Sequence, residues 1–568
     1  MPNSLVHSSN YVSLLSLRFL LLIAICCLVP CLCSETTNLD KITSCFIGHN
    51  ISNFTLYSSS NVSAYFDLLN FSLQNLRFSD ISFSKPSAII IPKSKEEISS
   101  IVLCCRKWSF DIRIRSGGHS YEGISSSSSS ASTSNNKTVI SAPFVVIDMM
   151  SLDKISVDLK SETAWVESGA TVGQTYYAIA ELSNVHGFPA GACPTVGVGG
   201  HFSGGGYGFL GRKYGVAADH VVDALLVDAK GQILNRDAMG KDVFWAIRGG
   251  GGGNWGIVFA WKIRLVKVPE IVTVLSVARP QHTIEKIIQQ FQNVVHDLDD
   301  KFHIIVLVTF GLHLENKEIA VIFQGLYQGP RSEALSILTN SFPSMEIREE
   351  ECKEMSWIRS VDYLSDISGG KGSISSLRER YFEDKAYFKV KSDYVRKPIP
   401  SVGIKTLIDF LQKKPKASAV FEPYGGFMEK TRSDAIAFPH RKGNIFSIEY
   451  TITWDEMDDR SGKSKKHMNW LRRFYNAMTP YVSSNPRAAY VNYIDLDLGE
   501  VTDISSTARD SPSPVDSARA WGEKYFLKNY DRLVMAKTII DPQNVFRHQQ
   551  SLPPMIETIS PKNYIYIE

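Results

Sequence analysis

The chain has 568 residues, of which 44% are hydrophobic and 21% are charged. This composition is ordinary for a globular protein with a large core and room for two or three domains. The formal net charge is only +3, and no block of Lys and Arg dominates any segment. The charge balance therefore gives no case for a nucleic-acid or other polyanionic partner.

The amino terminus has the pattern of a secretory signal peptide. Arg18 is followed by the apolar run FLLLIAICCLVPCLCS, which is too short and too interrupted by Pro and Cys to cross a membrane. We expect cleavage near residues 33–35, and no later stretch reaches the length of a membrane span of about 18 apolar residues. The sequence predicts a secreted or vesicular protein, without membrane attachment, and leaves cell wall, vacuole and ER-derived vesicle open.

The glycosylation sequons and the cysteines agree with a protein of the secretory pathway. Five Asn-x-Ser/Thr sites are candidates for glycosylation, namely Asn50, Asn53, Asn61, Asn70 and Asn136. Four of the nine cysteines leave with the signal, which leaves five in the mature chain: Cys45, Cys104, Cys105, Cys193 and Cys352. An odd number in an oxidising compartment means that at least one sulfur is outside an internal disulfide. No pair has the spacing of a zinc site, so we expect no metal.

From residue 87 the chain alternates strands and helices. Residues 87–92 and 111–115 read as strands, and Ser94 with Glu97 forms a capping box for the helix between them. The second strand runs into a Ser-Gly-Gly-His turn that can direct backbone N–H groups toward a phosphate, with Arg113 or Arg115 nearby. A serine-rich surface loop follows at residues 125–134.

The stretch from residue 187 to residue 215 contains eleven glycines in twenty-nine residues. It follows predicted strands at 144–148 and around 155–167 and a predicted helix at 171–182. So many glycines indicate a loop whose backbone must come close to a ligand. The alternative is a flexible linker, which the interleaved Cys, Phe, Tyr and His make less suitable. A strand at 221–228, a short helix at 242–247 and a run of five glycines come next.

Beyond Pro269 the pattern changes to long alternating strands at 302–310 and 319–327, mixed with helices near 283–298 and 464–478. This predicts an antiparallel sheet covered by helices, as a second domain of α+β type. In the strand at 444–454, a period of two puts apolar side chains on one face and Ser447, Glu449, Thr451 and Thr453 on the other. That polar face either meets solvent or lines a cleft with Glu449 as its carboxylate.

Several motifs occur in a fixed order: RSGGHSYEG (115–123), CPTVGVGGHFSGGGYG (193–208), FWAIRGGGGG, NYIDLDLG and DPQNVFRHQQSLPP. Together they resemble the berberine bridge enzyme-like family, plant members of the flavoprotein superfamily typified by vanillyl-alcohol oxidase. The resemblance runs from about Cys45 to Pro554. It implies an α+β fold with a two-part FAD-binding domain of the vanillyl-alcohol oxidase type and an α+β substrate domain.

The resemblance also implies domain boundaries. We expect a signal peptide at 1–34, a glycosylated, disulfide-bearing segment at 35–80, an FAD-binding domain (PCMH type) at 81–268 and a substrate-binding domain at 269–480. A C-terminal segment at 481–555 would return to the FAD-binding domain, followed by a tail at 556–568.

The resemblance implies FAD attached twice, through His119 to the 8α methyl group and through Cys193 to C6. Without it, a satisfied turn histidine and a buried inert thiol would be the simpler interpretations. Two links should raise the reduction potential of the flavin. The remaining expected flavin contacts are Arg115, Ser116, Gly117, Gly118, Ser120, Val196, Gly199 and Gly200. The family disulfide corresponds to Cys45 and Cys104, which leaves Cys105 and Cys352 free and buried.

Family members transfer a hydride from substrate to flavin while a base takes a proton, and O2 then reoxidises the flavin to give H2O2. Many use a tyrosine at the position of Tyr493, supported by Tyr207 and a lysine. Here Ser447 stands in place of that lysine, so no cation lowers a tyrosine pKa of about 10. Glu449 occupies the position where berberine bridge enzyme itself carries its glutamate base. We therefore predict Glu449 as base, with Tyr493, Tyr207 and Tyr121 contacting substrate and flavin.

Three further positions bear on the substrate and on oxygen. Ile494 replaces the arginine of the family's NYRD motif, and Glu422 adds a second acid where the pocket would lie. If both glutamates face the flavin, they favour a cationic substrate such as a protonated amine; if Glu422 points to solvent, that argument disappears. Val196, three residues after Cys193, is typical of oxidases.

We therefore expect a monomeric FAD oxidase acting on a plant specialised metabolite, foremost an isoquinoline-type alkaloid, with O2 as acceptor. Alternatives are an oxidase of carbohydrates or monolignols and a flavin-bearing glycoprotein without activity.

Overall fold

The computed structural model describes residues 37–57, 62–128, 133–134, 137–138, 142–310, 318–366, 370, 372–501 and 512–555. The predicted signal peptide, the tail at 556–568 and the sequons Asn61 and Asn136 lie outside the described residues. Among the described residues, no helix combines the length and the apolar character needed to cross a bilayer.

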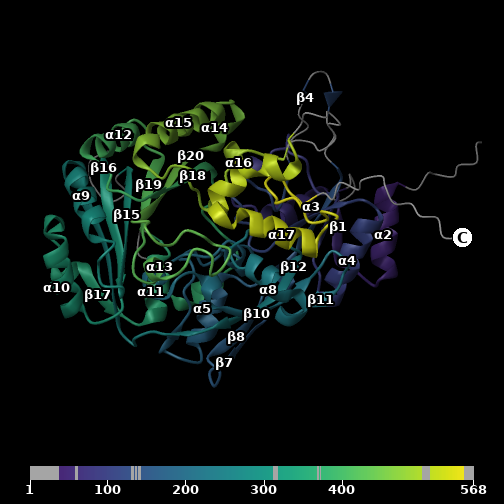
Figure 1. The fold of residues 1–568 in the computed structure, drawn as a ribbon, viewed down its shortest axis with the longest axis horizontal. Helices are drawn as coiled ribbons and strands as arrows, with labels where there is room; N and C mark the ends of the chain where they lie inside the picture. The colour runs from purple at the N-terminus through teal and green to yellow at the C-terminus, as the bar shows by residue number, and fades with distance from the viewer. Residues whose placement is uncertain are drawn as a thin grey trace, which may run out of the picture.

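The amino-terminal part, on the right in Figure 1, is built on a four-stranded sheet with the order β1–β2–β6–β3. Its strands are β1 (Phe54–Leu56), β2 (Ala88–Ile90), β6 (Phe144–Asp148) and β3 (Asp111–Arg115). β2, β6 and β3 are parallel, and every residue of β2 and β6 is buried, as expected for strands covered on both faces. Helices α2 (Asn38–Gly48) and α4 (Lys95–Lys107) pack beside it, joined by the disulfide Cys45–Cys104.

A second, antiparallel sheet has the order β11–β10–β12–β8–β7. Its strands are β11 (Ile233–Leu234), β10 (Val221–Val227), β12 (Ile257–Arg264), β8 (Thr163–Glu167) and β7 (Ile155–Asp158). The helices of this part are α5 (Val172–Ala180) and α8 (Arg236–Ala246). Most buried residues of these elements belong to one core with Trp261 and Trp521, whereas Val227 and Ile257 pack into the core of the amino-terminal sheet.

The third sheet has seven antiparallel strands in the order β17–β14–β16–β15–β19–β20–β18. Their bounds are β14 (Val272–Pro280), β15 (Phe302–Phe310), β16 (Ile319–Tyr327), β17 (Cys352–Met355), β18 (Tyr387–Val395), β19 (Ala417–Pro423) and β20 (Phe446–Trp454). Helices α9 (Ile284–Val294), α12 (Ser401–Leu411) and α15 (Ser464–Ala477) cover its outer face (Figure 1). The predicted antiparallel sheet covered by helices is confirmed.

The chain then returns to the amino-terminal part through α16 (Pro514–Phe526) and α17 (Tyr530–Ile540). The Lys537 ammonium, fully buried, donates to the Asn254 carbonyl at 2.7 Å and pairs with Asp541 at 2.7 Å. The Leu552 backbone N–H donates to the Asn254 side chain at 2.9 Å. These contacts fix the C-terminal segment beside the five-glycine run.

Shorter elements connect these layers. They are α3 (Val62–Phe71), α6 (Val198–Ser203), α7 (Gly211–Tyr214), α10 (Arg331–Ser341), α11 (Trp357–Leu364), α13 (Phe427–Lys430), α14 (Glu456–Arg460), β4 (Thr133–Ser134), β5 (Lys137–Thr138), β9 (His186–Gly187) and β13 (Val266–Lys267).

The glycine stretch at 187–215 is not a loop throughout, because α6 and α7 form within it. That part of the prediction is wrong: glycine weakens a helix by only about 1 kcal/mol per residue, and tertiary packing overrides it. Its glycines still serve close approach, since a Cβ on Gly197 would lie 2.2 Å from the Gly117 backbone nitrogen. Two loops therefore meet backbone to backbone.

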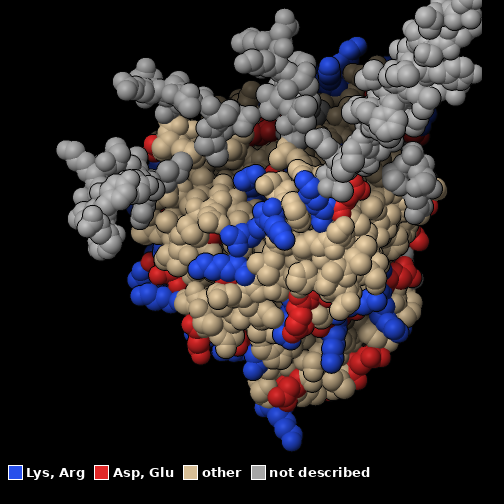
Figure 2. Space-filling view, turned by 90° about the vertical axis from the view of Figure 1, so that its right-hand side faces the viewer, with Lys and Arg blue, Asp and Glu red and all other residues tan. Residues whose placement is uncertain are grey.

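Charged side chains of both signs are interspersed on the face shown in Figure 2, with one short basic band across an otherwise uncharged area. Three predicted glycosylation sites can be placed. Asn50 is exposed, whereas Asn53 donates through Nδ2 to the Ile91 carbonyl at 3.1 Å and Asn70 has a buried Oδ1. Exposure therefore favours Asn50 as a glycan site.

Candidate active site

A cavity of about 660 Å³ lies between the glycine-rich segments and the inner face of the seven-stranded sheet. One wall is mostly backbone, from the turn at 116–119, the stretch at 191–203 and the glycine run at 251–253. The opposite wall comes from β18, β19 and β20 and from the segment around Tyr493. Its volume lies within the usual range of ligand sites, about 300–1,000 Å³.

His119 and Cys193 line this cavity and share one neighbour. The Thr195 hydroxyl lies 2.9 Å from His119 Nε2 and 3.6 Å from Cys193 Sγ. Burial lowers the pKa of His119 to about 4, so the imidazole is neutral near pH 7 and one ring nitrogen keeps its lone pair. Burial also raises the pKa of the Cys193 thiol. The sequence predicted that both residues face one ligand, and they line the same cavity.

Glu449 reaches the cavity from β20. Its strand alternates as predicted, with Phe446, Ile448 and Tyr450 buried in the core and Glu449, Thr451 and Thr453 lining the cavity. The Thr451 hydroxyl donates to the carboxylate at 3.1 Å. Burial raises the pKa of Glu449, although the hydroxyl groups of Thr451, Tyr493 and Tyr121 oppose the shift. A carboxylate with a raised pKa in a cavity suits general-base chemistry near neutral pH.

Glu422 lines the same cavity from the neighbouring strand, β19. It pairs across the sheet with Ser447, two residues before Glu449, so both carboxylates lie on one face in diagonal positions. The Tyr493 hydroxyl lies 3.5 Å from Glu422 Oε1. Burial, together with the charge of Glu449, raises the pKa of Glu422 to about 8. Glu422 therefore lines the cavity and does not point to solvent, which was the alternative that the sequence left open.

The three predicted tyrosines also line the cavity. Tyr121 stacks on Tyr493, with ring centroids 5.4 Å apart and an interplanar angle of 13°. The Tyr207 hydroxyl donates to the Pro423 carbonyl, and its ring stacks on Tyr424. Burial raises the pKa of Tyr493 well above its usual value, and the charges of Glu422 and Glu449 add to the shift. Tyr493 is therefore a poor base in this arrangement.

The other predicted flavin contacts divide into two groups. Ser116, Gly117, Gly118, Ser120, Val196, Gly199 and Gly200 line the cavity. Arg115 does not, which corrects its placement. It is fully buried, pairs with Asp148 at 2.7 Å and donates to the carbonyls of Leu68 and Leu69. Alternation along β3 puts both arginines on the same side, so they differ by what each meets along the strand: Arg113 lines the cavity, whereas Arg115 meets Asp148.

Sequence reasoning missed several residues of this cavity wall. His201 accepts a hydrogen bond from the Gly191 backbone N–H at 2.9 Å, and Asn254 and His548 line the cavity near the returning C-terminal segment. Burial lowers the pKa of His201 to about 4 and that of His548 to about 3. Their motifs were visible in the sequence, but only the fold shows which side chain points inward.

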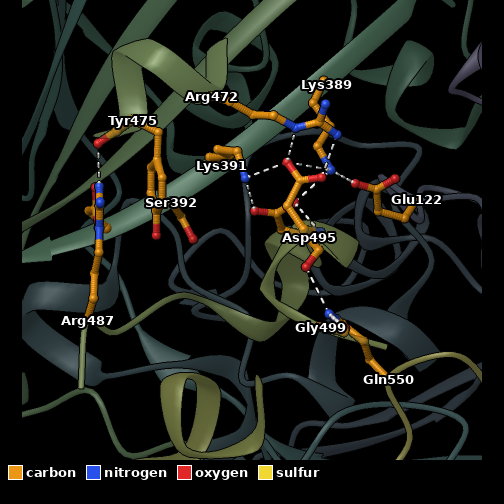
Figure 3. Close-up of polar contacts among 12 residues, drawn as sticks. Glu122, Lys389, Lys391, Ser392, Arg472, Tyr475, Arg487, Asp495, Gly499 and Gln550 are labelled. Carbon is orange, nitrogen blue, oxygen red and sulfur yellow. Dashed lines mark hydrogen bonds and ion pairs between the residues drawn. The ribbon is translucent and has the colours of Figure 1, made fainter. Parts of the chain in front are cut away.

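An ion cluster lies behind the cavity wall and consists of the buried Glu122, Lys389, Lys391 and Asp495 and the more exposed Arg472 and Asp497 (Figure 3). Lys389 contacts Glu122 and lies 2.6 Å from Asp495, whose other oxygen is 2.6 Å from Lys391. Although burial opposes its charge, Glu122 and Asp495 raise the pKa of Lys389. Glu122 directly follows Tyr121, and Asp495 lies two residues after Tyr493. The cluster therefore fixes the backbone on both sides of the stacked tyrosines.

Residues 86–236 match the model of an FAD binding domain, and residues 489–553 match the model described as berberine and berberine like. The chain is 53% identical to berberine bridge enzyme-like D-2 of Nicotiana tabacum over 542 residues, covering 93% of this chain and 94% of the relative. The protein belongs to the berberine bridge enzyme-like family. Like its family, it is an FAD-linked oxidoreductase.

Other members of the family extend the likeness. The reticuline oxidase of Papaver somniferum is 44% identical, with 96% of this chain and 97% of the relative covered. The structure of berberine bridge enzyme from Eschscholzia californica superposes with a TM-score of 0.84 at 44% identity, covering 90% of this chain and 99% of that one. A variant of that enzyme has been solved in complex with (S)-reticuline. These likenesses confirm the vanillyl-alcohol oxidase type of fold.

Proposed function

We propose that this protein is a secreted or vesicular FAD oxidase in which Glu449 is the base that deprotonates a bound small-molecule substrate. The observation that carries the proposal is the position of Glu449, which opens into the cavity beside Tyr121 and Tyr493 and forms no ion pair within the described chain. Its burial raises the pKa, which makes the carboxylate a stronger proton acceptor than an exposed one.

The backbone-rich wall fits FAD. The glycine run at 251–253 leaves room for a ligand, because a Cβ on Gly252 would find no atom nearer than 3.6 Å. His119 and Cys193 would hold the flavin covalently. When bound, FAD accepts a hydride from the substrate and passes the electrons to O2, which gives H2O2. The Thr195 hydroxyl orients the His119 imidazole, and Val196 borders the path by which O2 would approach.

A plant alkaloid of the isoquinoline type is the substrate class that the site supports best. Relatives that share 44% identity are named reticuline oxidase, and Glu422 and Glu449 line the cavity together with the rings of Tyr121 and Tyr493. A protonated alkylamine that also carries an aromatic ring would fill such a site with both its ring and its charge. Carbohydrates and monolignols carry no positive charge and would leave both carboxylates without a counter-ion.

Stopped-flow reduction of the bound flavin under anaerobic conditions tests the function. (S)-Reticuline and a tetrahydroprotoberberine should bleach the oxidised flavin, whereas cellobiose and coniferyl alcohol should not. Admission of O2 should then restore the flavin and form H2O2. Fast reduction by cellobiose or coniferyl alcohol, with none by the alkaloids, would contradict the alkaloid assignment. Absence of H2O2 with every compound would favour an inactive flavin-bearing glycoprotein.

Glu449→Gln tests the base. The variant should slow flavin reduction by about 10²–10⁴-fold, because a positioned base contributes that much. Glu354→Gln is the matched control, since Glu354 is exposed on β17 of the same sheet, and it should leave the rate unchanged. If the Glu449 variant keeps the wild-type rate, the proton goes to another group.

A further inference from the structure

Glu422 and Glu449 face one cavity without a cation between them. Neither carboxylate forms a salt bridge in the described part of the chain. Glu422 is opposite Ser447 in the register of β19 and β20, and Glu449 follows two positions later on the same face. Such diagonal positions are about 7–8 Å apart at Cα, within reach for long side chains. The two acids therefore share one environment.

The groups that surround the pair are neutral. They are the hydroxyl groups of Ser447 and Thr451 on β20 and the phenols of Tyr121, Tyr207, Tyr394, Tyr490 and Tyr493. Burial raises the pKa of each of these phenols. Hydroxyl groups can donate hydrogen bonds to the carboxylates but cannot cancel their charge.

The basic groups of the cavity wall are used elsewhere. Arg113 donates to the Arg547 carbonyl at 2.7 Å, and Arg547 pairs with Asp111 at 2.6 Å. His119, His201 and His548 are kept neutral by burial, which lowers the pKa of each to about 4 or below. Lys389 and Lys391 point to the opposite face of β18, into the ion cluster.

Two like charges in one buried site cannot both persist without compensation. Either one carboxylate keeps a proton or a cation enters. The aromatic rings of Tyr121, Tyr493 and Phe388, which line the same wall, would also attract an organic cation through their π faces. The site is thus built to exchange a proton for a positively charged ligand.

We propose that Glu422 and Glu449 carry one negative charge between them in the free protein, with the proton on Glu422, and that an organic ammonium ion displaces this proton when it binds. The proposal rests on the same cavity as the proposed function and adds the residue that selects the charge of the substrate. Glu422 loses a proton to solvent, the cavity gains one cation, and no electrons move. Glu449 stays ionised throughout and is free to act as base.

A permanently charged probe separates this exchange from catalysis. Benzyltrimethylammonium cannot be deprotonated at nitrogen, and neopentylbenzene is its uncharged carbon isostere. Titration calorimetry of the flavin-loaded protein in two buffers of different ionisation enthalpy counts the protons released on binding. Near pH 7 the wild type should release close to one proton per cation bound, and the release should fall toward zero above about pH 9, where Glu422 is already ionised.

Glu422→Gln should abolish the proton release and weaken binding of the cation by about tenfold or more, while binding of neopentylbenzene changes by less than about twofold. Glu354→Gln, the exposed control, should behave as the wild type. Wild-type release near zero at pH 7, unchanged release in Glu422→Gln, or equal affinity for the two probes would each overturn the proposal. If Glu422→Gln fails to retain flavin, the pH dependence of wild-type release decides alone.

The measured proton release does not depend on whether the protein oxidises alkaloids. Proton release that persists while no alkaloid reduces the flavin would contradict the proposed function and leave the proton exchange standing. Flavin reduction by alkaloids without proton release would support the proposed function and contradict the proton exchange.

Discussion

The two faces of strand β18 treat buried charge in opposite ways. On one face, Lys389 and Lys391 belong to an ion cluster with three carboxylates and Arg472. Each charged group of this cluster has a partner of opposite charge no more than 2.7 Å away. On the other face, Glu422 and Glu449 project from the neighbouring strands into the cavity and have only hydroxyl groups around them.

This difference distinguishes charged groups that stabilise the fold from charged groups that take part in binding and catalysis. A buried ion is stable when its partner is part of the protein, and removal of the partner is costly. A buried ion whose partner is missing keeps a shifted pKa, which is the condition for proton transfer and for recognition of a charged ligand. The cluster therefore holds the cavity wall in place, and the carboxylate pair performs the chemistry.

Loss of one cluster member should have the largest effect on stability. Lys389→Met leaves the Glu122 carboxylate without its closest partner and removes one of the two lysines bound to Asp495. The free energy of unfolding should fall by about 3–5 kcal/mol, the usual cost of breaking a buried ion pair. Denaturant unfolding, followed by intrinsic fluorescence, measures this change.

Two further variants test whether the missing partner charge causes the loss of stability. Lys353→Met, at an exposed lysine of β17, should change stability by no more than about 0.5 kcal/mol. Lys389→Met combined with Glu122→Gln should recover part of the loss, because the second change removes an unpaired charge. A single variant as stable as the wild type would contradict the structural role of the cluster.

Much of the fold follows from local pattern. The alternation in β20 predicted which residues face the core, and the capping residue Ser94 accepts a hydrogen bond from the Glu97 N–H at 3.2 Å, as expected. The helices α6 and α7 inside the glycine stretch were not predicted, because glycine content argues against helix while close packing of the two loops outweighs it. Such packing is a long-range property and leaves no local signal.

The site was predictable where a motif fixes a backbone position, as for His119 and Cys193. Arg115 was misplaced because it shares a face of β3 with Arg113, and the sequence does not show that only Arg113 meets the cavity while Arg115 pairs with Asp148. The two glutamates came from different strands, and their meeting depends on the register of β19 against β20. Register is set by the whole sheet, so the meeting of the two glutamates could be stated from the sequence only as a condition.

Glu422 should also make stability depend on pH. Its pKa of about 8 in the folded protein lies above the usual glutamate value of 4.5, so the folded state binds more protons than the unfolded state between these values. The free energy of unfolding should therefore fall as pH rises from about 5 to 8, by about 2–3 kcal/mol if part of the shift is lost to water in the cavity. In Glu422→Gln this slope should be absent.

Measurement of denaturation midpoints across this pH window, in protein without added ligand, checks the slope. Lys389→Met, which lies on the other face, should keep the wild-type slope from a lower starting stability. A Glu422→Gln variant that loses stability with pH as steeply as the wild type would mean that Glu422 is ionised in the folded protein at pH 5. The contrast between the two faces would then fail.

The smallest effect is expected for Tyr493→Phe. The variant removes a hydroxyl that lies 3.5 Å from Glu422 but keeps the ring that stacks on Tyr121. A weak hydrogen bond of this kind is worth about 0.5–1.5 kcal/mol, so the rate of flavin reduction should fall by less than about tenfold. Because the hydroxyl favours the ionised form of both glutamates, the pH at which the rate is half-maximal should also rise. A loss of more than about a hundredfold, with no shift in the pH profile, would make Tyr493 the base, and the carboxylate pair would then serve only to bind the cation.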